Sequence, residues 1–290
     1  MLRSVVYELN VMLIGTILLF ILTNVTGAPA DCRSRNRAPY DKEIRLKEYP
    51  YLALLTKDDD LCGGAIIDDK HIVTSAFCLH RFENTDGLDA HLGMKKLGDS
   101  DQIIQVKSMY PHEKFESGET SNDIGLVRLE LPITFNDIVK KARISQDCND
   151  IFEKDDELTA IGWRKLKRDS YPVTFQKENV CYVKPEQCRN TYKNKKHVKI
   201  TPEHICAWNT VKSDKSCKRN GGGPLIFPNR TTGKHEFVGI TSYGLDCSQT
   251  YPTIYTSVCD HFDWLAKTKS MSYEEEEDEK EEEDDDYDEY

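Results

Sequence analysis

Three absences in this 290-residue chain each exclude a class of protein. The longest apolar run, from Val11 to Leu22, is shorter than the ~20 residues that a membrane-spanning helix needs. No CxxC pair has the spacing of a zinc site, and no motif indicates a cofactor. No segment repeats along the chain, which argues against a repeat architecture. We therefore expect a protein without a metal, a cofactor or a transmembrane bundle.

The first thirty residues have the layout of a secretory signal peptide. Arg3 precedes the apolar run, and the small residues TGAPA follow it, so we expect cleavage between Gly27 and Ala30. The alternative is a signal anchor, because the run begins ten residues into the chain, after Glu8. The short run favours the signal peptide (residues 1–30) and a secreted, extracellular protein with no membrane contact after cleavage.

Ten cysteines in such a chain indicate an oxidising compartment, in which disulfides persist. The sequon Asn229-Arg230-Thr231 predicts a glycan on Asn229 if that segment is a surface loop.

The negative charge lies almost entirely at the C-terminus. Residues 273–290 hold 14 acids and one lysine, a charge of −13 within a total of −11, so the rest of the chain is close to neutral. Such a run buries too little apolar surface to offset its loss of conformational entropy, and we expect a disordered acidic tail over 273–290. Such a tail has two possible roles, as an extension that keeps the protein soluble or as an arm that binds a partner electrostatically.

Between these ends, many short β-prone runs alternate with turn-rich segments, which is typical of an all-β sandwich or barrel. The runs are 51–55, 64–68, 71–77, 123–129, 157–163, 224–227 and 236–244. After Cys259 the apolar spacing changes and predicts one terminal helix, with Phe262, Leu265 and Ala266 on one side.

Five blocks in order resemble the trypsin and chymotrypsin family of serine proteases. They are EYPYLALL, LCGGAIIDDKHIVTSAFC, NDIGLVRL, CKRNGGGPLIF, and SYGLDC with YPTIYTSVCDHFDWL, within residues 38–268. The resemblance implies an all-β fold of two antiparallel six-stranded β-barrels with a cleft between them and a C-terminal helix. We assign the trypsin-like domain to residues 31–272.

The resemblance also implies a set of disulfides. Four bridges match the family, Cys62–Cys78, Cys148–Cys259, Cys188–Cys206 and Cys217–Cys247. Cys32 and Cys181 remain and are paired by elimination. Leu158 and Phe227 stand where many members carry a further bridge, and we expect these apolar side chains to pack together.

Two of the three catalytic side chains of the family are missing. The family's reaction needs a serine nucleophile, a histidine base and a buried carboxylate that orients the histidine. In TSAFC the histidine position holds Phe77, and in RNGGGP the serine position holds Gly221. Asp123 of NDIGL remains, and we expect it to be hydrogen-bonded to Ser242.

Other positions of the family's site have changed as well. The oxyanion-hole glycine is Arg219, and the aspartate that pairs with a freed N-terminus is Asn220. The specificity-pocket equivalents are Lys215, Ser242, Gly244 and Thr253. His71, His80 and Ser216 lie near the lost residues in sequence. We expect His71 in a strand, His80 in a loop and Ser216 in the pocket wall. From these positions none of them can replace the missing base or nucleophile.

These losses predict a non-enzymatic, secreted serine protease homologue that acts by binding protein, as a cofactor, decoy or regulator of a protease cascade. Inactive members of this family serve so in invertebrate immune cascades and in venoms. The partner would be a protease, a zymogen or an inhibitor. The alternatives are an active secreted endopeptidase and an electrostatic binder that uses the acidic tail. Lysines at 193–199 form a basic stretch without aromatic interleaving, which does not indicate nucleic-acid binding.

Overall fold

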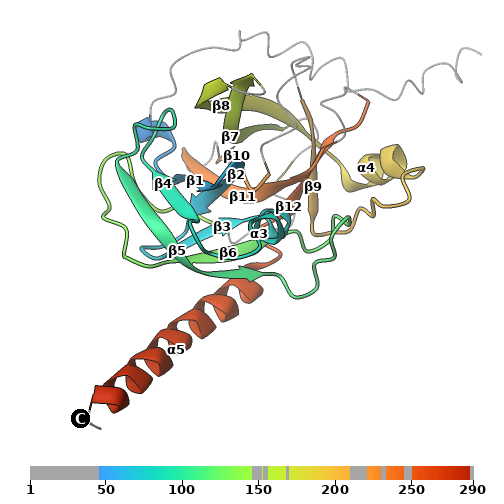
Figure 1. The fold of residues 1–290 in the computed structure, drawn as a ribbon. Coiled ribbons are helices and arrows are strands. Elements are labelled where there is room, and N and C mark those ends of the chain that lie inside the picture. The colour runs from blue at the N-terminus through green and yellow to red at the C-terminus, as the bar shows by residue number, and fades with distance from the viewer. Residues whose placement is uncertain are drawn as a thin grey trace, which may run out of the picture.

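The structure is a computed structural model that describes residues 46–145, 152, 156–167, 170–209, 221–229, 233–244 and 250–287. Within these residues the chain forms two closed antiparallel barrels of six strands each, with a long helix at the C-terminal end (Figure 1). This confirms the predicted fold class. The predicted signal peptide lies outside the described residues.

The first barrel has the strand order β1-β2-β3-β6-β5-β4. Its strands are β1 (Leu52–Lys57), β2 (Asp60–Ile66), β3 (His71–Thr74), β4 (Asp89–Leu92), β5 (Gln102–Pro111) and β6 (Gly125–Leu129). Lys57 pairs with Asp60 across a two-residue turn in which Asp58 has φ +51°. Aspartate tolerates this left-handed conformation, so the local sequence sets the hairpin register.

The second barrel has the order β10-β11-β12-β9-β8-β7. Its strands are β7 (Glu157–Lys167), β8 (Ser170–Val183), β9 (His204–Asn209), β10 (Pro224–Asn229), β11 (Lys234–Tyr243) and β12 (Thr253–Ser257). A 3-10 turn, η1 (Leu46–Glu48), precedes the first barrel, and α4 (Pro185–Tyr192) connects β8 to β9. Leu158 and Phe227 belong to one apolar cluster in this barrel.

A shared apolar cluster joins the two barrels. It includes Leu54 and Val73 from the first barrel and Ile161, Trp163 and Phe237 from the second. The indole N–H of Trp163 donates to the carbonyl of Ala53 across 3.2 Å. Burying an indole requires such a partner, so this bond fixes the barrels relative to one another.

The predicted strand 71–77 is wrong in its second half. β3 ends at Thr74, and α3 (Ala76–Phe82) begins immediately after it. The Ser75 side chain caps this helix by accepting a hydrogen bond from the Cys78 N–H. The cap turns the chain at a place where β-propensity alone favours a strand. His80 therefore lies in a helix and not in the predicted loop.

The structure confirms two predicted disulfides, Cys62–Cys78 and Cys188–Cys206. Cys181 and Cys259 are also disulfide-bonded. Their predicted partners, Cys32 and Cys148, and the predicted pair Cys217–Cys247 lie outside the described residues. The sequon begins at the last residue of β10, where Asn229 pairs with Lys234 of β11, and its glycan stays a prediction.

The expected disordered tail is wrong for residues 273–287, which continue helix α5 (Phe262–Tyr287). Helix growth adds one hydrogen bond per residue once a first turn is packed, and glutamate is a good helix former. Of the three apolar residues predicted on one side, Leu265 is buried, whereas Phe262 and Ala266 are exposed. Thr268 and Ser272 are buried with Leu265, and Ser272 makes polar contacts with His71 and Arg128 of the first barrel.

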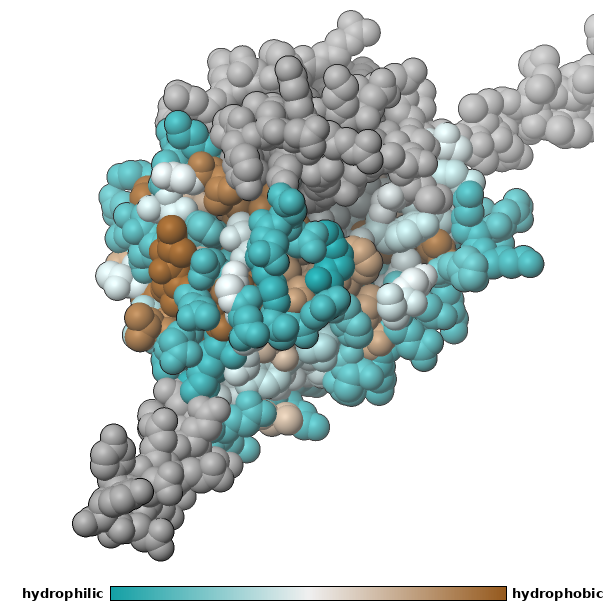
Figure 2. Space-filling view, viewed as in Figure 1, coloured by the Kyte–Doolittle hydropathy of each residue, from teal (hydrophilic) through white to brown (hydrophobic). Residues whose placement is uncertain are grey.

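Helix α5 leads away from the barrels and from α4, which precedes the lysine-rich stretch 193–199 (Figure 1). The described part of the acidic segment therefore lies apart from these lysines. Figure 2 shows hydrophilic surface over much of this face, with apolar atoms gathered near β4 and β5. No described helix combines the length and the apolar character needed to cross a membrane.

Candidate functional site

A cavity of about 370 Å³ lies between the two barrels. Both barrels line it: the first contributes Leu61, Cys62, Phe77, Cys78, Arg81, Gly118, Glu119 and Asp123, and the second Ala160, Glu178, Asn209, Gly221, Thr241, Ser242, Tyr243, Gly244, Thr253 and Tyr255. All three triad-equivalent positions therefore lie at one site, as the sequence predicted.

Phe77 presents an aromatic ring to this cavity from the first turn of α3. Its side chain is 43% exposed, although it is one of the large apolar residues of the chain. The guanidinium of Arg81, one helical turn later, lies 5.9 Å from the ring centroid, and Arg81 is also paired with Asp60. The ring offers apolar contact and accepts a cation on its face, but it transfers no proton.

Asp123 is buried, and each of its carboxyl oxygens accepts a hydrogen bond. The Phe77 N–H donates to its Oδ1 across 2.8 Å, and the Ser242 hydroxyl donates to its Oδ2 across 2.5 Å, as predicted. Burial raises the pKa of this carboxyl to about 6, while hydrogen bonds from Phe77, Ser242 and Ala76 oppose the rise. The carboxylate thus orients the start of α3 and holds the two barrels together.

Gly221 lies where the second barrel meets Cys78. Its carbonyl accepts a hydrogen bond from the Gly63 N–H across 2.9 Å, and a Cβ added here would lie 3.3 Å from the Cys78 Sγ. The next residue, Gly222, has φ +76°, and a Cβ there would overlap Thr74 and the Gly63 carbonyl. Close approach of two backbones therefore requires glycine at 222, whereas position 221 has limited room for a side chain.

The structure brings three of the predicted pocket residues together. Ser242, Gly244 and Thr253 all line the cavity. Lys215, Ser216, Arg219 and Asn220 lie outside the described residues. The described wall also carries Glu119 and Glu178, which sequence reasoning missed because neither belongs to a recognisable block.

Neither candidate replacement histidine lines the cavity. His80 packs edge-to-face on Phe115 at 5.3 Å. His71 is fully buried in β3, where its Nδ1 lies 2.8 Å from the Asp68 Oδ1 and its Nε2 lies 2.8 Å from the Ser272 Oγ.

The Asp68–His71–Ser272 chain has the residue types of a triad, but its setting is structural. Ser272 is fully buried and donates its hydroxyl proton to the Lys269 carbonyl across 2.8 Å. Burial alone would raise the pKa of Asp68, but its contacts with His71, Lys70 and Lys269 lower it to about 2. A buried serine that is already donating is not placed to attack a substrate. Sequence reasoning missed this chain because 201 residues separate His71 from Ser272.

No group of three metal-ligating side chains occurs among the residues that the structure describes. The described lining of the cavity offers an aromatic ring at Phe77, the Arg81 guanidinium, the carboxylates of Glu119 and Glu178, the buried carboxyl of Asp123, and hydroxyl and amide groups from the second barrel.

Comparisons with known proteins agree on one family. The family model described as Trypsin matches residues 41–265. Bovine coagulation factor XI is 29% identical over 210 residues, which are 71% of this chain but 33% of that protein. The clotting factor G beta subunit of Tachypleus tridentatus is 28% identical over 220 residues, 71% of this chain and 70% of that protein. This chain thus spans about a third of the length of the first relative.

A solved structure shows the same fold. It is that of neuropsin, a serine protease expressed in the limbic system of mouse brain. The TM-score is 0.66 at 26% sequence identity, and the match covers 79% of this chain and 98% of the other.

Proposed function

Since this chain belongs to the trypsin family of serine proteases, we propose that it is a secreted, catalytically inactive member that acts by binding protein. The single observation that carries the proposal is the pair Phe77 and Gly221, which line one cavity at the positions of the family's base and nucleophile. The phenyl ring of Phe77 cannot accept a proton, and Gly221, whose side chain is a hydrogen atom, offers no nucleophile.

The intact scaffold around these positions supports binding. Asp123 retains its hydrogen bonds to Phe77 and Ser242, and the Cys62–Cys78 disulfide holds the base of α3. At this site Phe77 lines the cavity and remains exposed, so its ring is available to a partner. Aromatic residues in such pockets often dominate protein–protein affinity.

The partner we propose is a component of an extracellular proteolytic cascade, as a protease, zymogen or inhibitor. Two relatives with matching domains are named as clotting factors. The disulfides of the described barrels favour an oxidising, extracellular location.

The first test is enzymatic. The purified protein is incubated with peptide and ester substrates and with a serine-directed phosphonate probe. We expect neither hydrolysis nor labelling. Stoichiometric labelling would instead identify an active endopeptidase, the alternative function.

The second test measures binding at the cavity. Partners captured from the native secretion are identified, and their affinity is compared for Phe77→Ala and for the matched control Phe135→Ala. Both phenylalanines are 43% exposed, but Phe135 does not line the cavity. We expect Phe77→Ala alone to weaken binding, by roughly 10-fold or more for a central aromatic contact. Equal affinities for both variants would place the interface elsewhere and contradict the proposal.

A further inference from the structure

The loop between β5 and β6 forms one wall of the cavity. It follows His112 and leads to Asp123, and it contributes Gly118 and Glu119 to the lining. Any change in the position of this loop alters the shape of the proposed binding site. The contacts that hold it therefore control the site.

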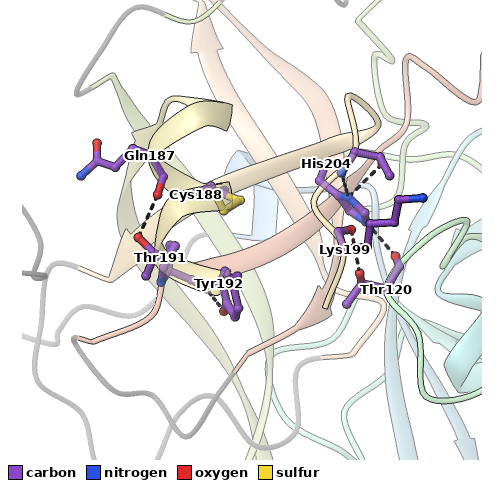
Figure 3. Close-up of a disulfide and its surroundings, with 10 residues drawn as sticks. Thr120, Gln187, Cys188, Thr191, Tyr192, Lys199 and His204 are labelled. Carbon is purple, nitrogen blue, oxygen red and sulfur yellow. Dashed lines mark hydrogen bonds between the residues drawn. A yellow bond between two sulfur atoms is a disulfide. The ribbon is translucent and has the colours of Figure 1, made fainter. Parts of the chain in front are cut away.

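His204, on β9 of the second barrel, holds the far end of the loop. Its Nδ1 accepts a hydrogen bond from the Thr201 N–H across 3.0 Å, so its proton must be on Nε2. From there it donates to the Thr120 carbonyl across 2.8 Å (Figure 3). Thr120 also donates from its hydroxyl to the Lys199 carbonyl. His204 is only 3% exposed, so water does not compete for these bonds.

His112 holds the near end of the loop. Its Nδ1 accepts a hydrogen bond from the Lys114 N–H across 3.1 Å, and its carbonyl accepts one from the Phe115 N–H across 2.9 Å. The ring is buried between Trp264, which stacks on it at 4.8 Å, and His261, which meets it edge-on at 5.5 Å. Both partners come from the C-terminal segment, at or just before α5.

Both clamping histidines are thus used in their neutral form. In each ring Nδ1 is an acceptor of a backbone N–H, from Lys114 at His112 and from Thr201 at His204, and a proton added there would face that N–H and break the bond. At His204 the Thr201 hydroxyl also lies 3.0 Å from Nδ1, and the Nε2–H bond to Thr120 survives protonation and raises the pKa of the ring. Burial nevertheless lowers the pKa of His112 and of His204, and the neighbouring His261 lowers both further. Protonation therefore opposes the burial of both rings and breaks the bond that joins His112 to Lys114 of the loop.

We propose that His112 and His204 form a pH-sensitive clamp that keeps the cavity wall 113–122 closed at neutral pH and releases it on acidification. The clamp itself does not depend on the proposed function. Its consequence, that acid weakens partner binding at the cavity, rests on that function. The clamp joins the first barrel, the second barrel and the C-terminal helix. Its release thus reaches all three parts that shape the site.

The charged groups around the clamp are few. Glu113, Lys114, Glu203 and His261 face His112, and its Nδ1 lies 3.8 Å from the Glu113 Oε2. Glu203 and His261 face His204. Burial and His261 lower the pKa of both rings, and Lys114 lowers that of His112. Glu113 and Glu203 favour the charged imidazoles, as does the bond from His204 to the Thr120 carbonyl, but both pKa values remain lowered.

The sign of the effect follows from these directions. A histidine whose pKa is lower in the folded state binds fewer protons there than in the open state. Closure is therefore favoured above the ordinary histidine pKa of ~6.5 and is lost as the pH falls below it. Asp123, at the end of the loop, has a raised pKa and acts in the opposite sense.

The experiment is hydrogen exchange of the loop amides in the full chain at pH 7.5 and 5.5, corrected for intrinsic exchange. It compares wild type with the double variant His112→Asn and His204→Gln. The asparagine Oδ1 retains an acceptor for Lys114, and the glutamine amide retains a donor for Thr120, but neither titrates. His197→Gln removes an exposed histidine and is the matched control.

We expect the drop in pH to speed exchange over 117–122 by roughly tenfold in wild type and in the control, because acid favours the open loop in which the imidazoles are charged. The double variant should show no such change. Equal pH responses in wild type and in the double variant would overturn the clamp.

Imidazole ¹⁵N shifts of wild type provide a second readout that needs no variant. His112 and His204 should keep the Nε2–H tautomer to a lower pH than His197. If His112 and His204 became protonated at the same pH as His197, the proposal would be overturned. This test holds even if the double variant does not fold. If the loop opens with acid but the captured partner binds equally at both pH values, the clamp stands and the cavity is not the binding site.

Discussion

The Ser242 hydroxyl donates to the buried carboxylate of Asp123 across 2.5 Å, and so links β11 of the second barrel to the first barrel. Among the described residues, no imidazole is hydrogen-bonded to that carboxylate, which also accepts a bond from the Phe77 backbone N–H. The hydrogen bond therefore has a structural role, which mutation measures directly.

Ser242→Ala should lower the free energy of unfolding by about 1–3 kcal/mol, because it removes one donor from a buried carboxylate. It should also raise the pKa of Asp123 further, since the Ser242 bond favours the charged form. Denaturant unfolding and a carboxyl ¹³C titration check the two effects. Ser117→Ala, at an exposed position of the cavity-wall loop, should change neither quantity.

Asp123 should make the fold more stable as the pH falls. Its folded pKa of about 6 exceeds its usual value of 3.8, so the folded state binds the proton first. The contribution is complete below pH ~4 and lost above pH ~6, with a size of about 3 kcal/mol. It is measured as the difference between the pH profiles of unfolding for wild type and Asp123→Asn, in which the contributions of His112 and His204 cancel. Parallel profiles would contradict it.

Restoring a nucleophile alone should not restore hydrolysis. In Gly221→Ser the hydroxyl has no base beside it, and its Cβ lies 3.3 Å from the Cys78 Sγ. We expect no more than roughly the 10³-fold enhancement over water that a site without a complete triad supplies. Adding Phe77→His should raise the rate, but only weakly, because Arg219 and Asn220 still replace family residues. Full activity in the single variant, measured with an ester substrate, would show that another base is present.

Truncation should separate the two parts of helix α5. The Ser272 carbonyl accepts from buried Arg128, and the Tyr273 ring lies 5.0 Å from its guanidinium. Removing residues 272–290 should therefore cost about 2 kcal/mol and lower the melting temperature by several degrees. Removing only 276–290 should change it by ~1–2 °C at most. Equal losses in the two truncations would show that the acidic end itself stabilises the fold.

The Cys188–Cys206 disulfide should stabilise the segment that carries the clamp. It closes a loop of 18 residues and ties α4 to β9 beside His204 (Figure 3). Replacing both cysteines with serine should lower the free energy of unfolding by about 3 kcal/mol. It should also speed amide exchange in α4. The comparison uses calorimetry and exchange at one pH, and an unchanged melting temperature would contradict the expected role.

Much of the candidate site follows from the sequence alone. The resemblance to the trypsin family, carried by short blocks of sequence, implied that Phe77 and Gly221 lie at one cleft and that Cys62 pairs with Cys78, and the structure brings these residues together. Local sequence also explains the turn at Asp58, whose φ is +51°. The blocks and the turn are runs of residue types, which a sequence displays directly.

Only the tertiary structure decided the rest. The contact of Ser272 with Arg128, the Asp68–His71–Ser272 chain and the loop clamp depend on hydrogen bonds between distant residues. Ser272 lies 201 residues from His71, and His204 lies 84 residues from Thr120. Neither separation follows any local periodicity, since closure of both barrels sets which buried donor meets which acceptor. The sequence thus determined which chemical groups this protein has and which it lacks, and the packing of the two barrels and α5 decided which of those groups meet.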